Sequence, residues 1–120
     1  MKDSELLRVA EEFRDGILDG QSSYLMCHVV SYPLQGFLQM LGVKSEVTVG
    51  DIGFANHVWL TLDDGRILDP TIDQYSQYEW CPKVKVYLGK ELPFYQAILD
   101  EDDPIWTGAT WHERMELLSD

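Results

Sequence analysis

The chain is organised around one stretch near its middle, Asn56-His57-Val58-Trp59-Leu60-Thr61-Leu62-Asp63-Asp64-Gly65-Arg66-Ile67-Leu68-Asp69-Pro70-Thr71. Two alternating apolar runs flank an Asp-Asp-Gly turn, which is typical of a β-hairpin. His57 and Asp69 stand at the outer ends of the two runs. A histidine and a carboxylate that orients it form the basic half of a catalytic triad, so the hairpin is a candidate site.

The length of the turn decides whether His57 and Asp69 meet. A two-residue turn would pair Asp69 with Leu60, and the pleat would then place it on the face opposite His57. A three-residue turn gives Gly65 the left-handed position of a common bulged hairpin and pairs Asp69 with Trp59. His57 and Asp69 then share a face as diagonal neighbours, about 7 to 8 Å apart at the backbone. We expect this turn because glycine stands third in it.

Length and composition predict one compact domain over residues 1–120, and the order of the predicted helices and strands described below makes it α+β. Of the 120 residues, 45% are hydrophobic and 12% are aromatic, which is enough apolar material for a core. Two cysteines, Cys27 and Cys81, are too few for a disulfide scaffold. No cysteine or histidine cluster has metal-ligand spacing, so we expect neither a metal nor another cofactor.

The sequence favours a cytoplasmic protein. Reduced cysteines are the default there, and the N-terminus lacks the charged region and apolar run of a signal peptide. No apolar stretch is long enough to cross a bilayer. The formal net charge of -12 repels nucleic acid and anionic membranes and would attract a basic protein or peptide substrate. No pattern indicates the oligomeric state.

Two N-terminal helices are expected. In the first, capped by Ser4, the predicted core face is Leu6, Ala10, Phe13 and Ile17. In the second, capped by Ser22 or Ser23 and ending at Gly42, the predicted core face is Cys27, Val30, Leu34, Phe37, Leu38 and Leu41. Pro33 either kinks this second helix or marks its start, and the unbroken spacing favours the kink.

The remaining elements are mainly strands. Strands are predicted over 43–49 and 83–88, beside the hairpin, which gives a mainly antiparallel sheet. Short helices are predicted over 92–99 and from Thr110 to Leu118.

Cys27 is the candidate nucleophile. A helix N-terminus stabilises a thiolate and so raises the fraction of nucleophile at neutral pH. The alternative is that Cys27 is a small apolar residue on a core-facing stripe. The adjacent His28 points to another side of a helix, so we assign it no role.

Cys27 opening a helix, a strand ending at Gly50, His57-x-Trp59 and Asp69-Pro70-Thr71 together resemble the core of the transglutaminase-like superfamily, a branch of the papain-like cysteine enzymes. The resemblance covers roughly Gln21 to Thr71 and follows the family order Cys, His, Asp. It implies a papain-like fold in which the nucleophile helix packs on a small, mainly antiparallel sheet.

The resemblance also implies residue roles. Cys27 would be the nucleophile, His57 the general base and acid, Asp69 the group that orients His57, and Trp59 a packing residue under the site. Gln21, six residues before Cys27, would be an oxyanion-hole donor or else a plain linker residue.

Three classes of function follow from these features. The first is a cysteine enzyme that transfers acyl groups from amide bonds of a protein or peptide, as a peptidase, deamidase or transamidase. The second is a catalytically silent module of the same fold that binds or inhibits a protein partner. The third is a small effector of another protein. Three triad residue types in the family order favour the enzyme.

Overall fold

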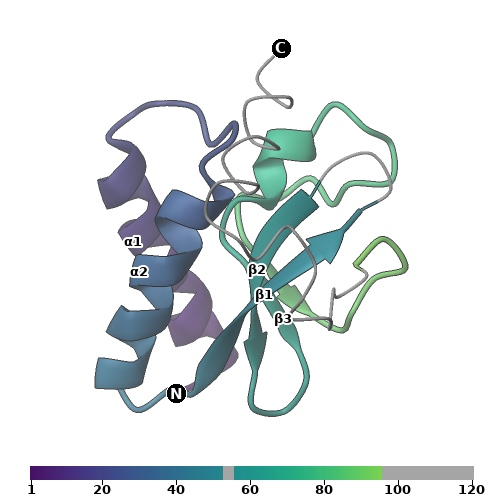
Figure 1. Ribbon diagram of the computed structural model, residues 1–120. Coiled ribbons are helices and arrows are strands. Elements are labelled where there is room, and N and C mark those ends of the chain that lie inside the picture. The colour runs from purple at the N-terminus through teal and green to yellow at the C-terminus, as the bar shows by residue number, and fades with distance from the viewer. Residues whose placement is uncertain (53–55, 96–120) are drawn as a thin grey trace, which may run out of the picture.

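The computed structural model describes residues 1–52 and 56–95 (Figure 1). In chain order the elements are α1 (Asp3–Leu18), α2 (Cys27–Met40), β1 (Ser45–Asp51), β2 (Asn56–Leu62), β3 (Ile67–Asp69), the 3-10 turn η1 (Ile72–Tyr75) and β4 (Tyr87–Gly89). The strands form an antiparallel sheet in the order β1-β2-β3-β4. The predicted α+β class is therefore confirmed. The helix predicted from Thr110 to Leu118, and most of the one over 92–99, lie outside the described residues.

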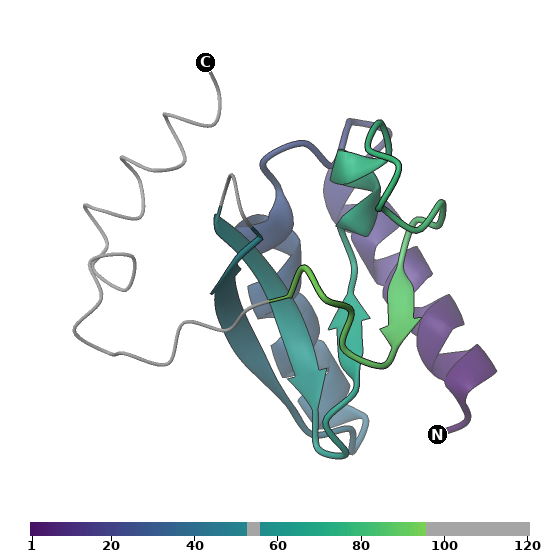
Figure 2. The same cartoon turned by 90° about the vertical axis from the view of Figure 1, so that its right-hand side faces the viewer.

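The two helices lie side by side against one face of the sheet (Figures 1 and 2). Side chains alternate between the faces of a strand, so every second residue of β2 points to the helices. The cluster on this face consists of Leu6, Ala10, Leu34, Leu38, Leu60, Leu62, Leu68 and Val86. A second cluster contains Ile52, Trp59, Ile67, Ile72, Tyr75, Cys81 and Tyr95. No helix within residues 1–52 and 56–95 is both long and apolar enough to cross a membrane.

The core face of α1 differs from the prediction in its second half. The buried residues are Leu6, Ala10, Arg14 and Leu18. Phe13 is only half-buried and Ile17 is exposed, so the prediction for Ile17 is wrong. The observed stripe steps by four residues throughout, because Asp73, an acidic partner at the edge of the core, pairs with Arg14 on the inner face.

The predicted N-caps are also wrong. Helix α1 begins at Asp3, and α2 begins at Cys27 after Met26, with no side-chain cap on either helix. Ser23, expected to cap α2, instead donates its hydroxyl to Asp73 Oδ1 at 2.6 Å. Its hydroxyl therefore serves a tertiary contact rather than the helix end.

Arg14 ties the first helix to η1. Its Nη1 donates to Asp73 Oδ2 at 2.9 Å and to the carbonyl of Lys85 at 3.1 Å. The Arg14 side chain is 5% exposed and that of Asp73 28%. Since Asp73 also binds Ser23, one carboxylate joins α1, η1 and the loop that enters α2.

Replacing Arg14 by methionine is expected to lower the free energy of unfolding by about 3 kcal/mol, because the change leaves a partly buried carboxylate without its cation. Arg66→Met is the matched control. Arg66 pairs with Asp3 and Asp64 at the surface, where such pairs contribute about 1 kcal/mol or less. Urea unfolding of both variants measures the difference. Equal losses would mean that the Arg14 pair is no more important than a surface pair.

Helix α2 runs without interruption through Pro33, so the alternative that it begins near that residue is wrong. Gly42, at φ 86°, adopts the left-handed conformation expected of a C-cap glycine. The inner face holds Cys27, Val30, Ser31, Leu34 and Leu38. Phe37 and Leu41 were predicted to be buried and are exposed. Cys27 is thus the first residue of the helix, as expected.

The hairpin has the predicted three-residue turn. Leu60 pairs with Leu68, and Gly65 takes the left-handed conformation at φ 88°. Extending the register by one residue aligns Asp69 with Trp59. The prediction that depended on the position of this glycine is confirmed.

The last strand is shorter than predicted. Strand β4 covers only Tyr87–Gly89, whereas the alternating pattern began at Lys83. Its partner β3 is itself three residues long, which limits the ladder that β4 can join. Lys83 instead donates from Nζ to the carbonyls of Ser76 and Tyr78.

Candidate functional site

Three elements bring Cys27, His57 and Asp69 to one end of the molecule. Cys27 opens α2, His57 lies at the start of β2, and Asp69 ends β3. Figure 1 shows α2 beginning in the upper part of the molecule, the part where η1 also lies. The side chains are deeply buried: Cys27 is 2% exposed, and His57 and Asp69 are 0% exposed.

His57 and Asp69 form a direct hydrogen bond. His57 Nε2 lies 2.7 Å from Asp69 Oδ2. A carboxylate can only accept, so Nε2 carries the hydrogen and donates it. This leaves Nδ1 as the ring nitrogen that can exchange a proton with another group.

Asp69 is itself held by two further donors. The hydroxyl of Tyr95 donates to Oδ2 at 2.7 Å. The backbone amide of Thr71 donates to Oδ1 at 3.1 Å. With both oxygens occupied, the carboxylate cannot rotate away from the imidazole, and the orientation of His57 is fixed in turn.

The other ring nitrogen of His57 faces a polar group of side chains. Tyr75 Oη lies 3.3 Å from Nδ1 and Gln74 Nε2 lies 3.4 Å from it. Cys27 also interacts with His57, and this interaction helps to raise the pKa of the imidazole. The imidazole therefore interacts with both the Asp69 carboxylate and the Cys27 side chain, which is the pairing that thiol activation requires.

The charge environment favours a protonated His57. Burial lowers the pKa of His57, but the charge of Asp69, the hydrogen bond to Asp69 and the interaction with Cys27 outweigh it. Together they raise the pKa of His57 from 6.5 to about 10. The imidazolium form thus persists at neutral pH and can act as a proton donor.

The shifted pKa predicts how stability depends on pH. A group that binds its proton more tightly in the folded state stabilises the fold when it is protonated. For His57 this stabilisation is complete below the unfolded pKa of 6.5 and is lost as the pH rises through the folded pKa of about 10. The free energy of unfolding of the wild type is therefore expected to decline between these values. His57→Gln should decline less, because glutamine does not titrate. Urea titrations of both proteins across this range measure the two slopes, and parallel slopes would contradict the assignment.

Trp59 lies beside the imidazole. Its ring centroid is 5.9 Å from that of His57 and 4.8 Å from that of Tyr95. Trp59 is 1% exposed, so it packs close to the two residues. Its indole Nε1 is buried and has no hydrogen-bond partner among the described residues.

Gln21 stands apart from these contacts. It is exposed, and it lines a shallow pocket together with Arg14, Asp15, Leu18, Gly20 and Lys85. The structure does not place it in the hydrogen-bonded group around His57. A different glutamine, Gln74, occupies that place.

Sequence reasoning missed three contributors, namely Gln74, Tyr75 and Tyr95. Gln74 and Tyr75 are the last two residues of η1, which follows the Asp-Pro-Thr segment. A short 3-10 turn has no hydrophobic period that would reveal which of its side chains face inward. Only the position of Gln74 and Tyr75 just after Asp69 could have drawn attention to them.

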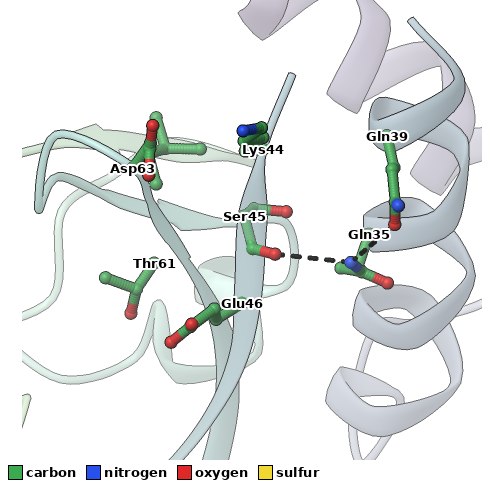
Figure 3. A pocket seen from close by; sticks show the side chains of 8 residues that line it. Gln35, Gln39, Lys44, Ser45, Glu46, Thr61 and Asp63 are labelled. Carbon is green, nitrogen blue, oxygen red and sulfur yellow. Dashed lines mark hydrogen bonds between the residues drawn. The ribbon is translucent and has the colours of Figure 1, made fainter. Parts of the chain in front are cut away.

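A separate pocket of about 420 Å³ lies far from this site (Figure 3). It opens between α2 and the end of the β1-β2 pair at which Ser45 pairs with Leu62, opposite the connection between the two strands. Gln35 Nε2 donates to the Ser45 carbonyl across it. His57 pairs with Gly50, five register steps away, or about 16 Å along the strand. The pocket is lined by none of the predicted site residues.

The described residues contain no group of three His, Cys, Asp or Glu side chains placed to hold a metal ion. Comparison of the chain with models of protein families, with curated proteins and with solved structures finds no match. The functional argument therefore rests on the geometry of the site.

Proposed function

We propose that this chain is a cysteine-dependent acyl-transfer enzyme with a transglutaminase-like core. The observation that carries the proposal is the alignment of a sulfur, an imidazole and a carboxylate. Cys27 opens a helix and interacts with His57, and His57 Nε2 is held 2.7 Å from Asp69 Oδ2. These are the groups, and the connections between them, that thiol-based acyl transfer requires.

The reaction would begin with the thiolate of Cys27. Its sulfur attacks the carbonyl carbon of an amide, and a tetrahedral oxyanion forms. The Nδ1 proton of His57 passes to the nitrogen of the departing amine, the carbon-nitrogen bond breaks and a thioester remains. Asp69 keeps the ring in place and stabilises its charge throughout.

The second half returns the enzyme to its starting state. Water or an amine attacks the thioester carbon, while Nδ1 of the now neutral His57 accepts the proton of the attacking group. The carbon-sulfur bond breaks and the thiolate is regenerated beside an imidazolium. Attack by water gives a peptidase or deamidase, and attack by an amine gives a transamidase.

Backbone amides at the start of α2 are the donors best placed for the oxyanion. The first amides of a helix have no partner within it, and Cys27 is the first residue of α2. One well-placed donor contributes about 3 to 4 kcal/mol to such a transition state. Gln21 is not needed for this role and stays exposed in the structure.

Substrate class and location follow from charge and redox chemistry. A net charge of -12 favours encounter with a basic protein or peptide and opposes nucleic acid. Cys27 and Cys81 are both free. A thiolate nucleophile must stay reduced to work, which fits the cytoplasm.

This function can be tested with an assay that does not require the natural substrate to be known. A mixture of basic peptides is incubated with the protein in water enriched in oxygen-18 and in the presence of a biotinylated amine. Hydrolysis places the heavy isotope in a new carboxyl group, and transamidation places biotin on the peptide. The wild type is expected to form one or both of these products. Cys27→Ala is expected to form neither. Products that persist in Cys27→Ala would overturn the proposal.

A catalytically silent binding module is the second candidate, and one observation favours it. Cys27 is only 2% exposed and His57 is fully buried, so an amide reaches the sulfur only if the site opens. In a silent module the same contacts would serve only to stabilise the end of the sheet. The oxygen-18 assay separates the two, since a silent module yields no labelled carboxyl group and no biotinylated peptide.

A further inference from the structure

The side chain of Gln74 joins both halves of the site. Its Oε1 accepts a hydrogen bond from the backbone amide of Leu25 at 3.2 Å. Its Nε2 lies 3.2 Å from Thr71 Oγ1 and 3.4 Å from His57 Nδ1. A single carboxamide thus contacts the segment before Cys27, the turn after Asp69 and the imidazole.

These contacts fix which way the amide faces. The Leu25 amide is a donor, so the oxygen of Gln74 must face it. The amide nitrogen of Gln74 therefore faces Thr71 and His57. Gln74 therefore presents hydrogens, and no lone pair, to Nδ1.

The hydrogen bond between Leu25 and Gln74 involves a residue with a strained backbone. Leu25 has φ 61°, a left-handed conformation that costs a residue with a side chain about 1 to 2 kcal/mol. It stands two residues before Cys27, which opens α2. The bond from Leu25 to Gln74 helps to hold this conformation and hence the direction in which α2 begins.

The contact of Gln74 with His57 limits which groups can accept the Nδ1 proton. The polar and charged groups around the ring are Asp69 at Nε2, and Gln74 and Tyr75 at Nδ1. Cys27 also interacts with the ring, and the Trp59 ring lies alongside. Gln74 cannot accept the Nδ1 proton. Burial raises the pKa of Tyr75, so its hydroxyl stays neutral and is a weak base. Of the groups described around the ring, Cys27 is then the one left to exchange this proton with His57.

We propose that Gln74 is a positioning residue for the Cys27–His57 pair: its oxygen holds the backbone that enters α2, and its nitrogen excludes a competing acceptor from Nδ1. The inference rests on the proposed function, because positioning the Cys27–His57 pair matters only if the pair is catalytic. Its contacts can nevertheless be tested without any substrate.

Gln74→Glu is the sharpest variant. It keeps an oxygen for the Leu25 amide and replaces the nitrogen beside Nδ1 with an acceptor of nearly the same size. His57 is expected to keep its Nδ1 proton to higher pH than in the wild type, as followed by nitrogen-15 NMR of the ring. Alkylation of Cys27 by iodoacetamide at neutral pH is expected to slow by about tenfold, because the new charge competes for the imidazolium and disfavours the thiolate.

Gln39→Glu is the matched control, since it makes the same change at an exposed position near the other end of α2. It should alter neither readout. Gln74→Met is the second test variant, to be used if Gln74→Glu fails to fold. This variant removes the acceptor of the Leu25 amide, so faster hydrogen exchange at Leu25 and slower alkylation are expected together.

The inference is overturned if Gln74→Glu leaves the His57 titration and the alkylation rate unchanged, if Gln39→Glu produces the same shifts, or if Gln74→Met behaves as the wild type. Failure of the proposed function has a different signature. In that case no acyl products form in the wild type, while the NMR titration of His57 still reports the effect of Gln74.

Discussion

Replacing His57 by alanine is expected to slow the alkylation of Cys27 by iodoacetamide at neutral pH by about a hundredfold, the size of a typical general-base contribution. In the proposed mechanism the imidazolium of His57 stabilises the thiolate of Cys27, which is the reactive form. His57→Ala removes this positive charge from the neighbourhood of the sulfur. Mass spectrometry of the Cys27 peptide after timed labelling gives the rate.

Two internal controls accompany this measurement. His28→Ala removes the neighbouring imidazole of α2 and should leave the rate unchanged. Cys81 should react slowly in every variant, because burial raises the pKa of its thiol and its Sγ hydrogen-bonds to the Ile72 carbonyl. If His57→Ala and the wild type react at the same rate, then His57 does not activate the thiol.

Asp69→Ala is expected to lower the free energy of unfolding by about 4 kcal/mol. The reason is the number of buried donors that the carboxylate satisfies. His57 Nε2, Tyr95 Oη and the Thr71 amide all bond to it, and its side chain is 0% exposed. Alanine would leave these groups unpaired in a site that water does not reach.

Two comparisons sharpen this prediction. Asp69→Asn keeps the size and one acceptor oxygen, so it should cost less stability than alanine while still slowing the alkylation of Cys27. Asp63→Ala, in the exposed turn of the same hairpin, should change the free energy of unfolding by about 0.5 kcal/mol or less. Urea unfolding gives all three values. If Asp69→Ala is as mild as Asp63→Ala, the hydrogen-bond network around Asp69 does not stabilise the fold.

The contact between His57 and Asp69 could be predicted because it depends on local rules. Alternation of apolar residues identified the strands, and Gly65 in third place identified the bulged turn. Together they fixed the register, which determines the face on which each side chain lies. Cys27 at the start of α2 followed in the same way from the spacing of apolar residues along one helix.

The surroundings of this contact could not be predicted, because they depend on tertiary packing. Arg14 lies on the inner face of α1 only because Asp73 reaches it from a turn 59 residues later in the chain. Gln74 contacts His57 because η1 folds back over the end of β2. Neither residue belongs to a periodic pattern that distinguishes it from an exposed polar residue.

Gln21 shows the limit of spacing as a guide. Its separation from Cys27 suggested a role at the oxyanion, yet the chain between them contains a left-handed residue, Leu25. Such a turn redirects the backbone, so distance along the sequence no longer predicts distance in space. Gln74, much farther along the chain, reaches the imidazole instead.

Trapping the covalent intermediate tests the central claim most directly. The protein is mixed with a p-nitrophenyl ester, quenched in acid and digested, and the peptide that contains Cys27 is weighed. We predict that this peptide gains the mass of the acyl group as a thioester in the wild type, and that the gain is lost in Cys27→Ala and strongly reduced in His57→Ala. A wild-type Cys27 peptide that stays unmodified while the ester is consumed, or equal acylation of Cys27 and Cys81, would contradict the account.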